Sequence, residues 1–528
     1  MTSEVELAQC WMDADPDDDT RQETLSLLAG DADELAARFT GRLQFGTAGL
    51  RAALGAGPQR MNRLLVRQAA AGLAKYLHQR DTQPSVVVGY DARHKSEVFA
   101  LDTARVMAAA GVRVSLLPRP FPTPVLAYAT TQLHASAGIM VTASHNPPTD
   151  NGYKVFLPDG SQIVAPIDVE ISACIDCIDP TRLDLAEVDD ERIVYLGDIE
   201  FEQYVAMTGT VRLLPTLPIA LRLAYTPLHG VGRETFLAAC RQSGLPAPMV
   251  VASQGDPDAN FPTVAFPNPE EPGALDRLIS LARQINADVA LANDPDADRL
   301  AAVIPTRTGE WRSLRGDEIG WLLADHILSN TTGDDRLVVT TLVSSSLLGK
   351  MALSYGVHAA ETFTGFKWIA EERRAHPDLH FVFGYEQALG YLVADRPRDK
   401  DGITAAILLV EAAALAASVG LTLEDRLSSI DERFGAHRIA ERSVPLPPDE
   451  GQRVVAALRA NPPDSIGGHV VTNVSDFPEA NLVRFQCGPH ARVQVRPSGT
   501  EPKVKVYGES IGGNPDALVD AVVALLIA

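Results

Sequence analysis

This sequence is poor in cysteine, lacks a long apolar run and has no basic N-terminal region. Five cysteines in 528 residues are too few for a disulfide framework. The lone CxxC pair, Cys174 and Cys177, has no second pair and no nearby histidine, which argues against a zinc site. No window approaches the ~18 uninterrupted apolar residues of a membrane span. The first residues, MTSEVELAQCWMDADPDDD, lack the features of a signal peptide, so we expect a cytoplasmic protein.

Positive charge is also scarce, because the formal net charge is -22. A nucleic-acid-binding protein needs a basic face for the phosphate backbone, and an anionic membrane surface attracts basic segments as well. We therefore expect no nucleic acid and no membrane among the partners. The sequence leaves open whether the chain is a monomer or a homodimer.

The chain is longer than a single hydrophobic core supports, and its pattern is that of repeated α/β units. Apolar runs such as SVVVGYD and VRVSLLP alternate with alanine-rich helical stretches, which predicts parallel α/β layers. The rhythm restarts at IALRLAYTPLHG and at DRLVVTTLVSSS, so we expect three related αβα domains. The tail is strand-rich and ends in one helix, which predicts a small α+β domain. The expected domains are residues 1–207, 208–310, 311–430 and 431–528.

The first loop whose residues could take part in a reaction is TASHNP, which follows the apolar run AGIMV. In parallel α/β sheets, functional groups lie on loops beyond the carboxyl ends of the strands. Pro147 and Pro148 restrict this loop, so Ser144 is expected to be presented in one geometry. A serine alone is a weak nucleophile, whereas a serine that carries a phosphoryl group needs a cation beside it.

A second loop, DPDADR, offers ligands for such a cation. Asp294, Asp296 and Asp298 occupy alternate positions, and in an extended segment every second side chain points the same way. Three carboxylates would then converge on one point. Oxygen ligands suit Mg²⁺, which also takes oxygens from phosphates. An EF-hand calcium loop is excluded, because its required glycine and glutamate positions hold Arg299 and Pro305.

Two further loops offer contacts for a phosphosugar. RPSGTEPK contains a guanidinium, two hydroxyls, a glycine amide and an ammonium group, a set that fits a phosphate. Glu386, in FGYEQALGYLV, lies in a glycine-bounded loop, where a carboxylate can accept hydrogen bonds from two sugar hydroxyls. Lys154 is a candidate acid or base if its surroundings lower its pKa. Arg51, in the glycine-rich turn QFGTAGLR, is a candidate phosphate contact.

Taken together and in this order, TASHNP, DPDADR and RPSGTEP resemble the motifs of the α-D-phosphohexomutase superfamily, the phosphoglucomutases and phosphomannomutases. The resemblance runs from QFGTAGLR to RPSGTEP, over nearly the whole chain. TFTGFKWI, GYEQALGY and DKDGITAA resemble one branch in particular, the phosphoglucomutase-2 and phosphopentomutase-like enzymes. The resemblance implies an α/β fold with three related αβα domains and a small C-terminal α+β domain around a central active-site cleft.

The resemblance also implies a role for each motif residue. Ser144 would be the phosphoserine, and either Lys154 or His145 would shuttle the hydroxyl proton. The implied catalytic residues are Ser144, His145, Lys154 and Arg51. The implied metal ligands are Ser144, Asp294, Asp296 and Asp298. The implied substrate contacts are Arg299, Lys367, Glu386, Arg496, Ser498, Gly499, Thr500 and Lys503.

The implied enzyme is an isomerase, an intramolecular phosphotransferase that interconverts hexose 1-phosphate and hexose 6-phosphate. Glucose and mannose phosphates are the expected small-molecule partners, with Mg²⁺ as cofactor and a sugar 1,6-bisphosphate as activator. Four alternatives stay open: a phosphopentomutase, a sugar bisphosphate synthase, a metal-dependent phosphohydrolase and a non-catalytic phosphosugar-binding protein. The sugar is undecided because Glu386 is followed by Gln387 and Ala388, whereas bacterial phosphomannomutases have a serine two residues after the glutamate.

Overall fold

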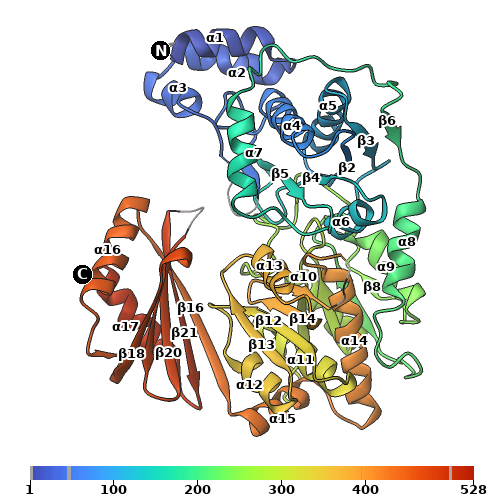
Figure 1. The fold of residues 1–528 in the computed structure, drawn as a ribbon. Coiled ribbons are helices and arrows are strands. Elements are labelled where there is room, and N and C mark those ends of the chain that lie inside the picture. Colours follow the sequence, from blue (N-terminus) through green and yellow to red (C-terminus); the bar gives the residue numbers. More distant parts are fainter. Residues whose placement is uncertain (1–3, 45–48, 394, 396, 499–501, 528) are drawn as a thin grey trace. The chain divides into compact units, whose positions relative to one another are not determined.

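The computed structural model describes residues 4–44, 49–393, 395, 397–498 and 502–527. The chain forms two compact units, and Figure 1 follows their elements along the sequence. The first unit comprises Met1–Leu314 and Leu389–Leu415, and the second comprises Arg315–Ala388 and Ala416–Ala528.

A six-stranded mixed sheet carries the serine loop of the first unit. Its strands are β1 (Leu50–Ala53), β2 (Ser85–Tyr90), β3 (Arg113–Leu116), β4 (Ala137–Val141), β5 (Asp150–Phe156) and β6 (Ile193–Tyr195). Their order is β1-β5-β4-β2-β3-β6. The four strands β4, β2, β3 and β6 are parallel, whereas β5 runs antiparallel to β4 and places Lys154 opposite Met140. The predicted strand before the serine is therefore β4, and the next strand returns beside it.

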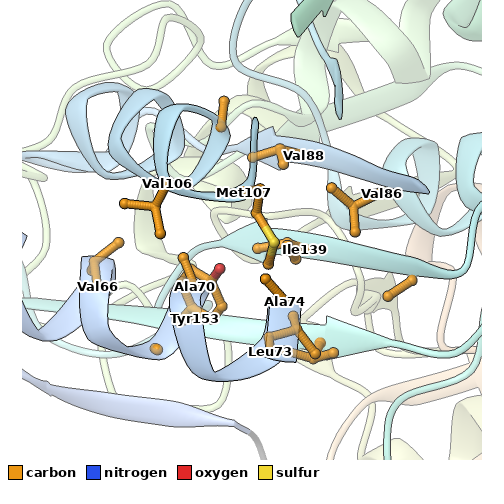
Figure 2. Packing of buried hydrophobic residues seen from close by; sticks show 14 of the residues in the cluster. Val66, Ala70, Leu73, Ala74, Val86, Val88, Val106, Met107, Ile139 and Tyr153 are labelled. Carbon is orange, nitrogen blue, oxygen red and sulfur yellow. The ribbon is translucent and has the colours of Figure 1, made fainter. Parts of the chain in front are cut away.

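Helices pack on this sheet and bury a continuous core. They are α4 (Arg63–His78), α5 (Ser96–Ala109), α6 (Thr123–Gln132) and α7 (Ile167–Asp176), preceded by α1 (Glu4–Ala14), α2 (Asp18–Leu28) and α3 (Ala32–Phe39). Figure 2 shows Leu73 of α4 and Met107 of α5 near Ile139 of β4 and Tyr153 of β5. Successive strand residues point to opposite faces. Because Tyr153 enters this core, Lys154 is directed away from it.

A second sheet of the first unit carries the aspartate loop. Its strands are β7 (Leu223–Thr226), β8 (Met249–Val250), β9 (Val289–Ala292), β10 (Ala301–Pro305) and β11 (Trp311–Ser313), in the order β11-β10-β9-β7-β8. The associated helices are α8 (Ile199–Thr208), α9 (Gly232–Gln242) and α10 (Asp276–Ile285). The loop between β9 and β10 contains DPDADR, so the three aspartates follow the carboxyl end of a buried strand. Farther along the chain, β15 (Gly390–Leu392) and most of the buried helix α14 (Gly402–Ser418) also belong to this unit.

The second unit begins with a parallel sheet. Strand β12 (Arg336–Thr341) pairs with both β13 (His358–Thr362) and β14 (His380–Glu386). The surrounding helices are α11 (Gly316–Asn330), α12 (Leu347–Ser354), α13 (Lys367–Ala375) and α15 (Leu423–Phe434). No single helix of the described chain is long and apolar enough to cross a bilayer. Within the described residues, α14 and α15 are the one pair of helices that together have the length and apolar character of a span, and a bend of 87° separates them.

An antiparallel sheet ends the chain. Its strands are β16 (His437–Pro445), β17 (Ser465–Ile466), β18 (His469–Phe477), β19 (Leu482–Cys487), β20 (Ala491–Pro497) and β21 (Lys503–Ile511), in the order β16-β21-β20-β19-β18-β17. Helices α16 (Pro448–Ala460) and α17 (Asp516–Leu526) pack on one face of it (Figure 1). The sequence predicted one helix here. The second, α16, begins at a proline, which fits a first helical turn because its missing N–H would have no partner there.

A buried polar network ties this sheet to the loop after β12. Glu509 of β21 accepts hydrogen bonds from Ser345 Oγ at 2.6 Å and from Arg492 Nε at 2.7 Å, and it lies 2.7 Å from Nδ1 of His437. Arg492 also donates to the carbonyl of Ser344 at 2.7 Å. Burial alone would raise the pKa of Glu509, but Arg492, His437 and Ser345 lower it well below its ordinary value. The carboxylate is therefore ionised and acts as the centre of the network.

Replacing Glu509 by glutamine is expected to lower the free energy of unfolding by about 3 kcal/mol, because Arg492 then loses its buried counter-ion. Urea unfolding followed by circular dichroism measures this loss. The matched control is Glu441→Gln on β16, whose partner Lys505 lies 2.7 Å away in a partly exposed pair. That change is expected to cost less than about 1 kcal/mol. Equal losses in the two variants would contradict the structural role given to Glu509.

Candidate active site

Ser144 lies in the loop that follows β4, and a local network fixes its backbone. Its φ of 52° is left-handed, which is uncommon for a residue other than glycine. Thr142 Oγ1 accepts a hydrogen bond from the Ser144 amide at 2.9 Å and donates one to Asp91 Oδ2 at 2.6 Å. Only 2% of Ser144 is exposed. The single geometry predicted from the two prolines therefore also depends on buried hydrogen bonds.

The hydroxyl of Ser144 contacts the aspartate loop directly. Its Oγ donates to Asp294 Oδ2 at 2.7 Å, although the two residues are 150 positions apart in the chain. His145 Nδ1 lies 3.2 Å from Ser144 Oγ. The fold thus brings the first two predicted loops together at one serine.

The three aspartates converge as predicted, but by a different route. Each offers a carboxylate oxygen, and these oxygens lie within 4.8 Å of one another. The segment is not extended: the amide of Ala297 donates to the carbonyl of Asp294 at 2.9 Å, and Ala297 has a φ of 55°. A tight turn with a left-handed residue, rather than strand-like alternation, therefore gathers Asp294, Asp296 and Asp298.

The hydrogen bonds of this triad leave oxygens that suit a metal ion. Asp296 Oδ2 accepts from Thr123 Oγ1 at 2.6 Å and from Lys154 Nζ at 2.7 Å. Asp298 Oδ2 lies 3.0 Å from Lys154 Nζ and 3.2 Å from Lys400 Nζ. The Oδ1 atoms of Asp296 and Asp298 are buried and have no hydrogen-bond partner in the described part of the chain. Buried anionic oxygens without partners are costly, and an oxygen-seeking divalent cation such as Mg²⁺ would satisfy them.

Charges within the site shift several pKa values in opposite directions. Burial alone would lower the pKa of Lys154, but Asp296 and Asp298 raise it above its ordinary value. Burial opposes ionisation of Asp298, yet Lys154, Lys400 and Arg299 hold its pKa well below the usual range. Lys154 is therefore a fixed cation in this arrangement, and the lowered pKa that would make it a base is not found.

Asp294 and His145 shift toward their neutral forms. Burial and the two neighbouring aspartates raise the pKa of Asp294 well above its ordinary value. Burial, together with Arg299 and Arg51, lowers the pKa of His145. A neutral imidazole beside a hydroxyl is able to accept its proton.

The two predicted arginines of the first unit lie near these groups. Arg51, on β1, donates from Nη1 to Asn146 Oδ1 in the serine loop at 2.9 Å. The amide of Arg299 donates to Asp294 Oδ1 at 3.0 Å. Part of the turn that precedes Arg51, residues 45–48, lies outside the described chain. Arg51 thus contacts the serine loop, and Arg299 contacts the aspartate loop.

The predicted sugar contacts belong to the second unit. Glu386, at the end of β14, accepts a hydrogen bond from the Gly365 amide at 3.0 Å. Lys367 begins α13, is 6% exposed and has its Nζ 5.9 Å from the ring centroid of Trp368. The Glu386 carboxylate thus holds the turn that precedes Lys367 and α13.

Of the predicted phosphate contacts, Arg496 lies in β20, Ser498 follows that strand and Lys503 begins β21 of the same unit. The amide of Ser498 donates to the carbonyl of Lys503 at 2.8 Å, which closes the loop. Arg496 Nε is buried and has no hydrogen-bond partner among the described residues. Gly499 and Thr500 lie outside the described residues.

Two residues that contact the triad were not predicted from the sequence. Thr123 begins α6 and bonds Asp296, and its amide also donates to the Asp296 carbonyl at 2.9 Å. Lys400 reaches Asp298 from the stretch DKDGITAA, which had been noted only for its resemblance to one branch. The signal for Lys400 was therefore present, whereas nothing in the sequence around Thr123 singled it out.

Gly152, on β5, makes a close approach that supports the site. A Cβ at this position would lie 2.5 Å from the Thr142 carbonyl oxygen and 2.8 Å from that of Leu50. We expect Gly152→Ala to lower the free energy of unfolding by about 2 kcal/mol, because the backbone has to shift. Urea unfolding tests this, with Gly197→Ala as control, since a Cβ at Gly197 meets nothing within 4 Å. Similar losses in both variants would show that the close approach is not limiting.

A buried serine that faces three carboxylates on an α/β scaffold is an arrangement suited to phosphoryl transfer. Three family models match consecutive stretches of the chain. They are the alpha/beta/alpha domains I, II and III of phosphoglucomutase/phosphomannomutase, over residues 42–182, 202–309 and 315–433. The chain belongs to the phosphoglucomutase/phosphomannomutase family.

Curated relatives are similar over most of their length. A Haemophilus influenzae protein named "Probable phosphomannomutase" is 44% identical over 86% of this chain and 94% of its own length. The mouse phosphopentomutase is 34% identical, covering 96% of this chain and 90% of the relative. The phosphoglucomutase of Staphylococcus haemolyticus is 34% identical, covering 89% and 90%.

Solved structures share the fold. A phosphoglucomutase/phosphomannomutase family protein from Burkholderia thailandensis has a TM-score of 0.71 at 21% identity, covering 92% of this chain and 98% of that one. Parafusin, a phosphoglucomutase from Paramecium, has a TM-score of 0.70 at 16% identity, covering 92% and 94%. The predicted fold class, three αβα domains and a further C-terminal α+β domain, is confirmed. The predicted enzyme class, an isomerase that transfers a phosphoryl group within its substrate, is confirmed with it.

Proposed function

We propose that this enzyme interconverts hexose 1-phosphate and hexose 6-phosphate, of glucose, mannose or both, through a phosphoserine at Ser144 and a bound sugar bisphosphate. The observation that carries the proposal is the 2.7 Å hydrogen bond from Ser144 Oγ to Asp294 Oδ2 within the acidic triad. The Haemophilus influenzae relative named as a phosphomannomutase and the staphylococcal phosphoglucomutase support a hexose.

In this proposal each predicted site residue of the first unit has a defined role. Asp294, Asp296, Asp298 and the phosphorylated Ser144 would hold Mg²⁺. A bound Mg²⁺ neutralises negative charge on the transferred phosphoryl group. When Ser144 takes up a phosphoryl group, a bond forms from Oγ to phosphorus and the bond from phosphorus to the sugar oxygen breaks. The hydroxyl proton passes to neutral His145 and from there to the departing sugar oxygen, which leaves as a hydroxyl group.

The remaining predicted roles are part of the same proposal. Lys154 stays protonated and balances the charge of the aspartates, which leaves His145 as the proton shuttle. Arg51 supports the transferred phosphoryl group, and a sugar 1,6-bisphosphate activates the enzyme by phosphorylating Ser144. The proposed substrate contacts are Arg299, Lys367, Glu386, Arg496, Ser498, Gly499, Thr500 and Lys503.

We also propose the domain limits 1–207, 208–310, 311–430 and 431–528. The matched family stretches end at residues 182, 309 and 433, and the first three proposed domains end at residues 207, 310 and 430. A cytoplasmic monomer or homodimer that acts on small sugar phosphates completes the proposal.

A pentose phosphate is the second candidate substrate. The mouse phosphopentomutase covers 96% of this chain. The sugar loop also lacks the serine of bacterial phosphomannomutases, and Gln387, beside Glu386, is engaged with Ser344: its Oε1 accepts from Ser344 Oγ at 3.1 Å. The loop therefore presents no hydroxyl at the position where those enzymes do.

The test has two parts, done with full-length enzyme and Mg²⁺. The first incubates the enzyme with radiolabelled glucose 1,6-bisphosphate and maps the retained label, which is expected on Ser144. The second compares kcat/KM for glucose, mannose and ribose 1-phosphates. A higher value for ribose 1-phosphate would replace the hexose proposal by the pentose one.

Other outcomes of the same test identify the remaining alternatives. Release of inorganic phosphate without retained label would indicate a phosphohydrolase, and accumulation of free bisphosphate a synthase. No label and no turnover of any sugar would indicate a binding protein and overturn the proposed function.

A further inference from the structure

The serine loop is gathered around one buried arginine, Arg93, which follows β2. Its Nη2 donates to the carbonyls of Ser144 and Asn146, both at 2.6 Å. Its Nη1 donates to the carbonyls of Pro147 at 2.8 Å and Asp150 at 3.3 Å. Only 5% of Arg93 is exposed. A single guanidinium therefore binds four main-chain carbonyls of the segment from Ser144 to Asp150, the first residue of β5.

A second path of hydrogen bonds leads from Arg93 to the same serine. Asp91 Oδ1 accepts from the Arg93 amide at 3.0 Å and from Ser96 Oγ at 2.6 Å, and Asp91 Oδ2 lies 3.5 Å from Arg93 Nε. The same Oδ2 accepts from Thr142 Oγ1, which in turn accepts from the Ser144 amide. Both the carbonyl and the amide of Ser144 are thus bound within one buried network.

This arrangement explains how a serine keeps a left-handed backbone. Residues in sparsely populated backbone regions persist only where the surroundings over-determine them. Without the network, Ser144 is free to relax to an ordinary conformation, which would swing its Oγ away from Asp294. A planar guanidinium suits the task because its donors point outward in a fixed fork, whereas the ammonium of lysine is a compact point charge.

We propose that Arg93 is a positioning residue that holds the Ser144 hydroxyl against the acidic triad and so sets the rate of phosphoryl transfer to and from Ser144. The inference rests on the proposed function of Ser144 as the phosphoryl carrier. Arg93 is buried and its terminal nitrogens are bound to main-chain carbonyls, so its loss is expected to affect transfer rather than substrate affinity. A displacement of about 1 Å at a reacting group lowers rates by about 10²-fold.

The test variant is Arg93→Lys, which keeps the positive charge but loses the planar set of guanidinium N–H donors. The rate of single-turnover phosphorylation by radiolabelled glucose 1,6-bisphosphate, and kcat, are expected to fall by about 10²-fold. KM for glucose 1-phosphate is expected to change by less than about threefold, because no substrate contact is removed. Free guanidinium ion added to Arg93→Ala is expected to restore part of the lost rate.

The matched control is Arg336→Lys in the second unit. Arg336 is also 5% exposed and donates to four main-chain carbonyls, those of Leu328, Thr331, Gly333 and Tyr355. Both lysine variants are expected to lose similar unfolding free energy in urea, but only Arg93→Lys is expected to lose the transfer rate. Equal losses of rate in the two variants, or an unchanged rate in Arg93→Lys, would overturn the inference.

Two further comparisons keep the outcome decisive. If Arg93→Lys does not fold, Thr142→Val removes the other hydrogen bond to Ser144 without changing shape, and it is expected to show the same loss of rate with unchanged KM. A wild-type rate in Thr142→Val would then overturn the inference. If the wild-type enzyme itself retains no label on Ser144, the proposed function fails, which is a separate result from normal labelling of both variants.

Discussion

Replacing Ser144 by alanine is expected to lower turnover of glucose 1-phosphate by on the order of 10⁴-fold or more, because the proposed mechanism then has no acceptor for the phosphoryl group. The hydroxyl that is lost is the one that donates to Asp294 Oδ2 at 2.7 Å. Turnover is measured in Mg²⁺ with a trace of glucose 1,6-bisphosphate. The intact mass of the variant after incubation with the bisphosphate is expected to show no added phosphoryl group.

A buried serine elsewhere in the first unit serves as control for this variant. Ser243, after α9, donates from Oγ to the carbonyl of Thr208 at 3.1 Å and is 5% exposed. Ser243→Ala is expected to keep turnover within about twofold, since it removes only one ordinary hydrogen bond, worth about 1 kcal/mol of stability. Turnover in Ser144→Ala within tenfold of wild type would place the phosphoryl carrier elsewhere.

The parts of the site that could be predicted are those that follow a strand in the sequence. Ser144 follows β4 and Asp294 follows β9, so the rule that loops at the carboxyl ends of strands carry function located both. The meeting of the aspartates was also predicted, although from an extended segment that does not exist. Ala297 takes a left-handed backbone, which no propensity assigns to alanine.

The parts that could not be predicted depend on contacts between distant segments. Thr123 and Asp296 are 173 positions apart in the chain. The stretch DKDGITAA marks a branch of the family, but nothing in it indicates that Lys400 contacts Asp298. Arg93 binds carbonyls, and a carbonyl is present at every position, so no pattern of residue types marks its partners. The fold was easier to predict than these contacts, because the three αβα domains repeat one pattern of strands and helices, whereas each contact is specific to its pair of residues.

Replacing Lys154 by methionine is expected to destabilise the protein strongly when Mg²⁺ is absent. Lys154 Nζ lies between Asp296 Oδ2 and Asp298 Oδ2, at 2.7 and 3.0 Å, and the side chain is 3% exposed. Removing one partner of a buried ion pair costs about 3–5 kcal/mol, because the remaining charge has no compensation. Turnover is expected to fall by about 10²-fold or more, since a fixed cation is lost from beside the transferred phosphoryl group.

Added Mg²⁺ distinguishes this role of Lys154 from simple packing. A ligand that binds only the folded protein stabilises it by RT ln(1 + [L]/Kd), so tighter binding gives a larger stabilisation at the same ligand concentration. The variant site has lost one cation while keeping three carboxylates, so Mg²⁺ is expected to bind it more tightly and to raise its Tm more than that of the wild type. The control is Lys95→Met, whose Nζ lies 3.1 Å from Asp17 in a more exposed pair and whose Tm is expected to respond to Mg²⁺ as the wild type does. An equal response of Tm to Mg²⁺ in Lys154→Met and in wild type would mean that the ion does not bind at the aspartates that Lys154 neutralises.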